Sequence, residues 1–318
     1  MKIEPLQVSK VIQQNFSHLM TDFYEMQTEY MASLNFIYED LDASLVAMVI
    51  TNDIYKNVYQ NGAHQNTSIK FFYEADHFST PISSLKIKDI SSRINLPRET
   101  VRRKKEKLIK DKLIFVDYKK KTYSLNTAKI DKKVIELQMN NISKFLHKFS
   151  QFFIKNKFYI KDVKREQIKQ DLDKKFLIYL TKFLDFQISY FSNLKSFVDI
   201  ESIFITLLVS LNTLSQKNKL KPLNYKDLFY RIHELNTSHG LNATSISEIT
   251  RIPRTTVLRK IANLEKIGLI KKDKFKRYAV DSLNNSTQGN KIFTAVEYNL
   301  KILGVFFSQC LETYSKSY

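Results

Sequence analysis

The sequence contains an internal repeat, and this feature constrains the fold more than any other. When the chain is shifted by 156 residues, the segment 89–114 aligns with the segment 245–270 without a gap. Fainter matches at offsets of 157 and 158, such as Asp42 with Asp199, extend the similarity outward. Because two units of this length account for nearly all of the 318 residues, we expect a duplicated architecture with a boundary near residue 158.

Identity between the two copies is concentrated in the windows 98–121 and 254–277, where eleven positions are the same. Chance seldom produces so many matches in so short a segment. The identical pairs are Arg98/Arg254, Thr100/Thr256, Val101/Val257, Arg103/Arg259, Lys104/Lys260, Leu108/Leu264, Lys110/Lys266, Leu113/Leu269, Ile114/Ile270, Asp117/Asp273 and Lys120/Lys276.

Both copies show the same order of predicted elements. Apolar residues recur at helical spacing through 11–60 and 172–215, and no proline interrupts either stretch. The repeated segment then predicts two helices joined by a tight turn, followed by a β-like hairpin. A final helical stretch covers 128–158 in the first copy and 290–315 in the second.

This order predicts a mostly α protein made of two tandem winged-helix units with flanking helices, arranged as a pseudo-twofold fused dimer. We expect the first unit at 1–158, with its winged helix at about 83–126. The second unit is expected at 159–318, with its winged helix at about 241–282.

The charge of the chain predicts a polyanionic partner. The formal net charge is +19, from 51 basic and 32 acidic residues. Window 98–121 holds eleven basic and four acidic residues, and window 254–277 holds nine and two, so each carries +7. Because most of the excess charge lies in the repeated segment, we expect that segment to meet double-stranded DNA.

The second helix of the repeat has a core side and an exposed side. Val101 and Leu108 share one face, together with Lys105, whose aliphatic stem we expect to pack while its amine reaches water. Arginine can pair bidentately with guanine and glutamate can accept a bond from the cytosine amino group. We therefore predict that the opposite side contacts DNA through Arg98, Glu99, Arg102 and Arg103, and in the second copy through Arg254, Thr255 and Arg259.

A basic hairpin beside such a helix suits phosphates or the minor groove. The predicted contacts there are Lys119, Lys120 and Lys121 in the first copy and Lys274, Lys276 and Arg277 in the second. Thr100 and Thr256 are included as phosphate contacts, with a purely local backbone role as the alternative.

The run Arg98-Glu99-Thr100-Val101-Arg102-Arg103 resembles the recognition helix of the cyclic-AMP-receptor/Fnr group of bacterial regulators, which carries the pattern R-E-T-V-x-R. Thr255 stands where that pattern has Glu, so the resemblance does not carry cytosine reading to the second copy. The layout of each unit is similar to that of MarR-type regulators, in which helices flanking a winged helix form the dimer interface. The first resemblance implies base-reading roles for Arg98, Glu99, Arg103, Arg254 and Arg259.

No enzyme signature is present in the sequence, and we expect no enzyme activity, no catalytic residue and no cofactor. The six histidines are scattered, and the single cysteine, Cys310, lies among apolar residues, so neither a metal site nor a reactive thiol is expected. We expect the aromatic residues near the end of the first copy to pack in the core, with an effector pocket as the alternative. They are Phe145, Phe149, Phe152, Phe153 and Phe158.

The longest apolar run, 203–209, is far shorter than the roughly 20 residues of a membrane span. We therefore expect no membrane partner and a cytoplasmic, nucleoid-associated location, since residues 1–10 also lack an apolar signal core. The predicted function is that of a sequence-specific double-stranded DNA-binding transcriptional regulator, a monomer that acts as a pseudo-dimer.

Two alternatives to this function remain open. A plasmid- or phage-type replication initiator would keep DNA binding, whereas a winged-helix adaptor would bind proteins instead. RNA polymerase and a small-molecule effector are further partners that the sequence leaves open.

Overall fold

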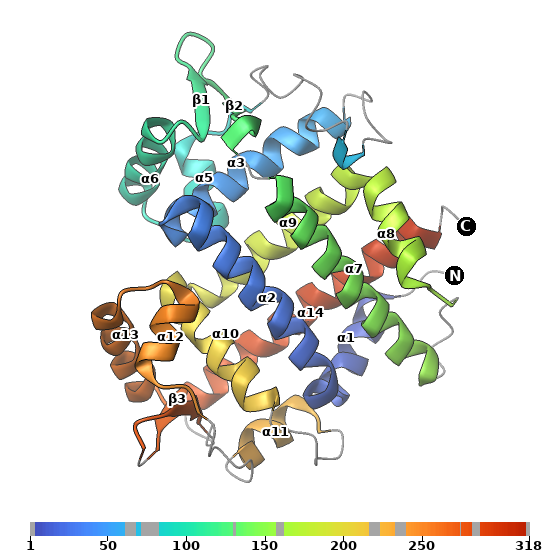
Figure 1. Cartoon of the computed structure of the whole chain (residues 1–318), viewed down its shortest axis with the longest axis vertical. Helices are drawn as coiled ribbons and strands as arrows, with labels where there is room; N and C mark the ends of the chain where they lie inside the picture. Colours follow the sequence, from blue (N-terminus) through green and yellow to red (C-terminus); the bar gives the residue numbers. More distant parts are fainter. Residues whose placement is uncertain are drawn as a thin grey trace. The chain divides into compact units, whose positions relative to one another are not determined.

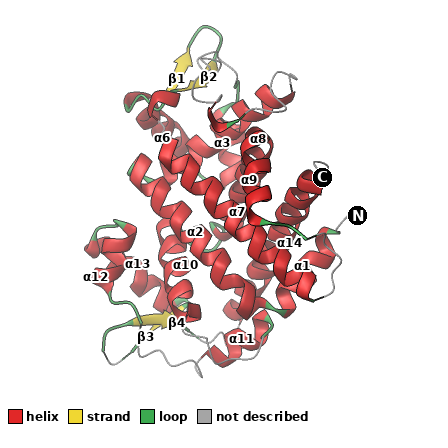
Figure 2. Cartoon of the chain, turned by 45° about the vertical axis from the view of Figure 1, so that its right-hand side comes forward, coloured by secondary structure: helices red, strands yellow, loops and turns green. Residues whose placement is uncertain are grey.

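The computed structural model describes residues 4–60, 68–70, 83–129, 132–156, 162–215, 223–232, 240–273, 275–281 and 287–315. This part of the chain is mostly helical, and its strands form two antiparallel two-stranded sheets (Figure 2). The prediction of a mostly α protein is therefore confirmed.

The elements follow one another as Figure 1 labels them. They are α1 (Pro5–Gln14), α2 (Phe16–Tyr38), α3 (Leu41–Gln60), α5 (Ile87–Ile94), α6 (Arg98–Lys110), β1 (Ile114–Asp117), β2 (Thr122–Leu125), the 3-10 helix η2 (Thr127–Lys129), α7 (Lys132–Lys155), α8 (Arg165–Lys174), α9 (Phe176–Leu194), α10 (Ile200–Ser215), α11 (Tyr225–Arg231), α12 (Ala243–Thr250), α13 (Arg254–Lys266), β3 (Ile270–Lys272), β4 (Tyr278–Val280) and α14 (Thr287–Ser315).

The described residues form two compact units that differ from the two halves of the sequence. One unit contains 37–192 and the end of α14 from residue 306, and the other contains 4–36 and 193–305. Helix α1 and most of α2 thus belong to the unit that carries α12 and α13, while α8 and α9 belong to the unit that carries α5 and α6. The repeat boundary expected near residue 158 lies outside the described residues.

In the first of these units, α3 is the scaffold for the repeated segment. It packs against α5, α6 and β2, as Figure 1 shows. Helix α5 buries Ile90 and Ile94, and α6 buries Val101 and Leu108, so the apolar positions at helical spacing face the core as predicted. Lys105 is half-buried, with its amine 5.7 Å from the centre of the Tyr123 ring.

In the other unit, α10 has the same role and packs against α12, α13 and β4. Helix α13 buries Val257, Ile261 and Leu264, which are spaced by four and three residues and therefore form one face. Ile261 stands at the position of Lys105, so this second helix has a fully apolar core side.

The turn between the two helices is built alike in both copies. The hydroxyl of Ser91 donates to the carbonyl of Leu96 at 2.6 Å, and Ser247 makes the equivalent bond of 2.7 Å to Ile252. The residue that ends the first helix has a left-handed backbone in each case, with φ of 50° at Asn95 and 57° at Arg251. Pro97 and Pro253 are the N-cap residues of the second helix in the two copies.

The turn of each hairpin begins with an aspartate that accepts backbone bonds from the residues of that turn. Asp117 accepts from the amides of Lys119 and Lys120, and Asp273 accepts from the amides of Phe275 and Arg277. Such bonds favour a tight reversal of the chain between paired strands.

The second hairpin is one residue shorter than the first. Ile114 pairs with Leu125, whereas Ile270 pairs with Val280, an offset of 155 rather than 156 on the second strand. The left-handed residue of the turn is accordingly Lys121 in one copy and Lys276 in the other, with φ of 55° and 58°. The ungapped alignment of Lys120 with Lys276 is therefore wrong, because the deletion lies in the turn.

A third segment joins each hairpin. Ser83 forms an antiparallel bridge to Tyr123, and Leu241 forms the corresponding bridge to Tyr278. In both bridges the two backbone amides donate to the opposite carbonyls, with Tyr123 to Ser83 at 2.7 Å and Tyr278 to Leu241 at 2.8 Å. The chain ahead of α5 and α12 is thus anchored to the strand that ends each hairpin.

Aromatic residues of α7 and α14 form part of the core of the unit that contains α5 and α6. The rings of Phe149 and Phe153 lie 5.6 and 5.2 Å from that of Phe307, and Phe145 is equally buried. The expectation of core packing is confirmed for these residues, while Phe152 is half-buried and Phe158 lies outside the described residues. Within the described part, no helix has the length and apolar character to cross a membrane.

Candidate nucleic-acid interface

Helix α6 exposes the side chains that the sequence assigns to DNA. Arg98, Glu99, Arg102 and Arg103 are all exposed, and Thr100 is half-buried next to the buried Val101. No described core residue lies on this exposed face.

An ion-pair network covers the middle of this face. Arg102 donates to both carboxylate oxygens of Glu99 at 2.6 and 3.0 Å, and to Glu106 at 3.0 Å. The hydrogen bond from Arg102 lowers the pKa of Glu99 below its usual value. Glu99 therefore already has a donor within its own helix, and the spacing of three and four residues between opposite charges is the sequence signal for this network.

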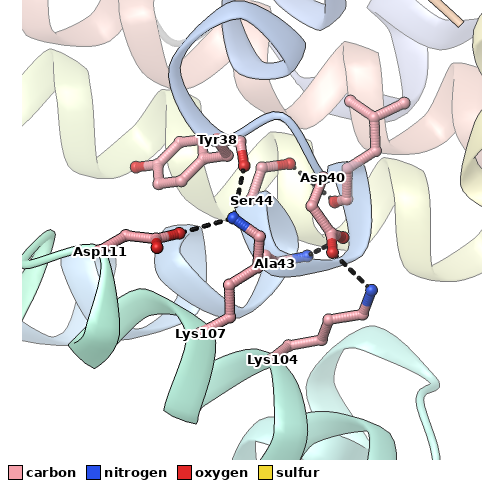
Figure 3. A network of polar contacts seen from close by, with 8 residues as sticks. Tyr38, Asp40, Ala43, Ser44, Lys104, Lys107 and Asp111 are labelled. Atoms are coloured by element: carbon pink, nitrogen blue, oxygen red, sulfur yellow. Dashed lines mark hydrogen bonds and ion pairs between the residues drawn. The ribbon is translucent and has the colours of Figure 1, made fainter.

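Two further lysines of α6 bond to their own unit (Figure 3). The amine of Lys104 lies 2.6 Å from Asp40, and these side chains are only 17% and 19% exposed. Asp40 also accepts the amide of Ala43 at 2.9 Å, so it caps the start of α3. Lys107 bonds to Asp111 at 2.6 Å and to the carbonyl of Tyr38 at 3.3 Å.

The second copy repeats the pairing of a lysine of the second helix with the aspartate that caps the scaffold helix, and we call this pairing the clamp. Lys260 lies 2.8 Å from Asp199 and 3.0 Å from Glu201, and Asp199 caps α10 through the amide of Ser202. Burial acts to raise the pKa of Asp199, but the hydrogen bonds from Lys260 and Ser202 outweigh it and leave that pKa lowered.

The clamp also corrects the sequence alignment outside the repeated segment. Asp199 was paired with Asp42, whereas the shared roles of capping and lysine binding pair it with Asp40. From the sequence, Lys104 and Lys260 contribute only to the basic excess. Their identity in the two copies reflects a structural role in fixing the second helix to its scaffold.

Helix α13 presents an exposed face with a different composition. Arg254, Thr255 and Arg259 are exposed, as the sequence predicts, and Thr256 is half-buried. Leu258 is 37% exposed at the position of Arg102, so no ion-pair network like that of α6 forms there. The Nε of Arg254 donates to Thr244 of α12 at 3.3 Å.

The hairpin tips differ in how much of their charge is paired. Lys119, Lys120 and Lys121 are all exposed, and so is Lys276. Arg277 is instead half-buried, pairs with Asp273 at 2.9 Å and lies 4.7 Å from the ring centre of Phe275. Lys274 lies outside the described residues.

Cys310 is 1% exposed, so the expectation that it is buried among apolar residues is confirmed, and this burial raises the pKa of its thiol to about 12. Among the described residues, no group of three or more potential metal ligands is clustered.

In comparisons with known proteins, no family model matches this sequence, and no curated protein or solved structure is significantly similar to it.

Proposed function

We propose that this chain is a sequence-specific double-stranded DNA-binding transcriptional regulator that acts as a single-chain pseudo-dimer. The observation that carries the proposal is the duplication of one surface: both copies expose arginines at the same two positions of the second helix. These are Arg98 and Arg103 in α6, and Arg254 and Arg259 in α13. A helix that exposes arginines near its start can pair them with guanine in the major groove.

The geometry of each copy supports assignment to the winged-helix class. Two helices joined by a tight turn are followed by a hairpin, and a segment ahead of the first helix bridges to the last strand. The hairpin is then the wing, with Lys119, Lys120, Lys121 and Lys276 placed to contact phosphates.

The pseudo-dimer rests on the exchange of helices between the repeats. Helices α1 and α2 occupy the unit of the second copy, and α8 and α9 occupy the unit of the first. Phe149 of the first copy and Phe307 of the second also pack in the same unit, with ring centres 5.6 Å apart. A fused pair needs no second chain, so sedimentation at micromolar concentration should give a monomer of about 37.5 kDa.

The test is to change Arg98 and Arg254 to Ala together and measure binding to duplexes selected from a random library. We expect a loss of at least about tenfold, since each arginine that pairs with a base contributes roughly 1–3 kcal/mol. The matched control is Lys10→Ala with Lys301→Ala, which removes the same charge at exposed positions of α1 and α14.

If the arginine variant binds duplexes as tightly as the control variant, these helices do not read DNA. A chain that binds no duplex in any of these forms would instead favour the protein-binding adaptor. Binding confined to repeated elements of a replication origin would favour the replication initiator.

A further inference from the structure

The two second helices differ along one strip of their exposed faces. In α6 this strip is Glu99, Arg102 and Glu106, which pair with one another. The equivalent residues of α13, 156 positions later, are Thr255, Leu258 and Ala262. A fully charged strip in one copy is therefore an uncharged strip in the other, and every residue of the second strip carries a methyl group.

The strip of α13 is not part of the core. Val257, Ile261 and Leu264 form the core side of this helix and are at most 1% exposed. Thr255 and Ala262 are exposed, and Leu258 keeps 37% of its surface in contact with solvent. The fold therefore does not require methyl groups at these positions.

The surroundings of the strip indicate what covers it. Arg254 and Arg259 are exposed on either side of Leu258 in the helix, which makes an apolar protein surface a poor partner and a polyanion a good one. Double-stranded DNA presents one apolar group in the major groove, the 5-methyl group of thymine. Alanine and the threonine methyl group contact that methyl group directly in known complexes, and the apolar leucine side chain offers the same kind of surface.

We infer that the strip Thr255, Leu258 and Ala262 recognises thymine 5-methyl groups, so that the half-site read by α13 is selected by methyl contacts and that read by α6 is not. This inference rests on the proposed function. It assigns different chemistry to two half-sites that the shared arginines would otherwise make alike.

The experiment compares a duplex selected by the natural protein with the same duplex in which deoxyuridine replaces every thymidine. This change removes only the methyl groups. Burying one methyl group is worth about a fourfold change in affinity, so one or two contacts predict binding that is about 4- to 15-fold weaker.

Two matched variants exchange the strips. Thr255→Glu with Leu258→Arg and Ala262→Glu gives α13 the strip of α6. For this variant, the ratio of the affinity for the thymidine duplex to that for the deoxyuridine duplex should fall to about one. The reciprocal variant, Glu99→Thr with Arg102→Leu and Glu106→Ala, should raise the ratio by about another fourfold when it is measured on a duplex selected by that variant and on its deoxyuridine counterpart. All six positions are exposed, so circular dichroism and thermal unfolding should show both variants folded.

The possible results separate the inference from the function on which it rests. Tight duplex binding with equal affinity for the two duplexes would overturn the inference alone. A preference for thymine that persists when α13 carries the charged strip would also overturn it. Failure of the natural protein to bind either duplex would overturn the proposed function itself.

Discussion

Replacing Lys104 with Met would remove the ammonium group that joins α6 to the start of α3. The pair with Asp40 is 2.6 Å long and its side chains are 17% and 19% exposed, so both charges are largely out of water. A hydrogen bond between charged groups in such a setting contributes about 1.5–3 kcal/mol. The variant leaves the Asp40 carboxylate without its cation, and we expect the free energy of unfolding to fall by about 2 kcal/mol.

A double-mutant cycle isolates the pair. Asp40→Asn keeps an oxygen acceptor for the amide of Ala43, so the cap of α3 is retained while the charge is lost. The single variants and the double variant with Lys104→Met should give a coupling energy of about 1.5 kcal/mol, measured by urea-induced unfolding followed by circular dichroism.

The control pair is Glu99 and Arg102 in the same helix. It has the same distance of 2.6 Å, but its side chains are 72% and 52% exposed. Solvent screening should make the coupling in a cycle of Glu99→Gln and Arg102→Met clearly smaller than that of Lys104 and Asp40. Equal coupling for the two pairs, or none for Lys104 and Asp40, would refute the argument that burial makes the clamp structural.

Three further predictions concern backbone, thiol and acid behaviour. Lys112→Gly should stabilise the fold by about 1 kcal/mol and Gly268→Ala should destabilise it by a similar amount in thermal unfolding, because both residues have positive φ (56° and 73°) just after the second helix. Cys310 should react with a thiol reagent at pH 8 only after denaturation, since burial raises its pKa to about 12; rapid labelling of the native chain would contradict this. The pKa of Asp199 is lowered in the fold, so the stabilisation from its ionised carboxylate is present above about pH 4, the usual pKa of an unfolded aspartate, and is lost in stronger acid. The difference in free energy of unfolding between the natural chain and Lys260→Met should therefore narrow below about pH 4. A difference that stays constant from pH 6 to pH 3 would contradict the pairing.

The sequence predicted the repeated segment well because its periodicity is local. The spacing of Val101 and Leu108 placed one face of α6 in the core, and both the turn before this helix and the hairpin after it lie within the segment 83–126, where they were expected. The exposed arginines at 98 and 103 follow from the same helical geometry.

Other features could not be predicted because they depend on contacts between distant residues. Asp40 and Lys104 are 64 positions apart, and nothing in either segment marks them as partners. Which copy a flanking helix joins is also hidden, since α1, α2, α8 and α9 each have an apolar face that could bury against either repeat. The one-residue deletion in the second hairpin appears only in the strand register and in the backbone of Lys276.

The most direct test of the account is the salt dependence of duplex binding, measured by fluorescence anisotropy between about 50 and 200 mM salt. If roughly eight cationic side chains meet phosphates, log K should fall with log salt at a slope of about −7. Changing Lys119, Lys120 and Lys121 to Ala should flatten the slope by about 2 to 3 while the preferred sequence stays the same. A slope near zero for the natural chain would contradict the claim that the duplicated basic surface binds DNA.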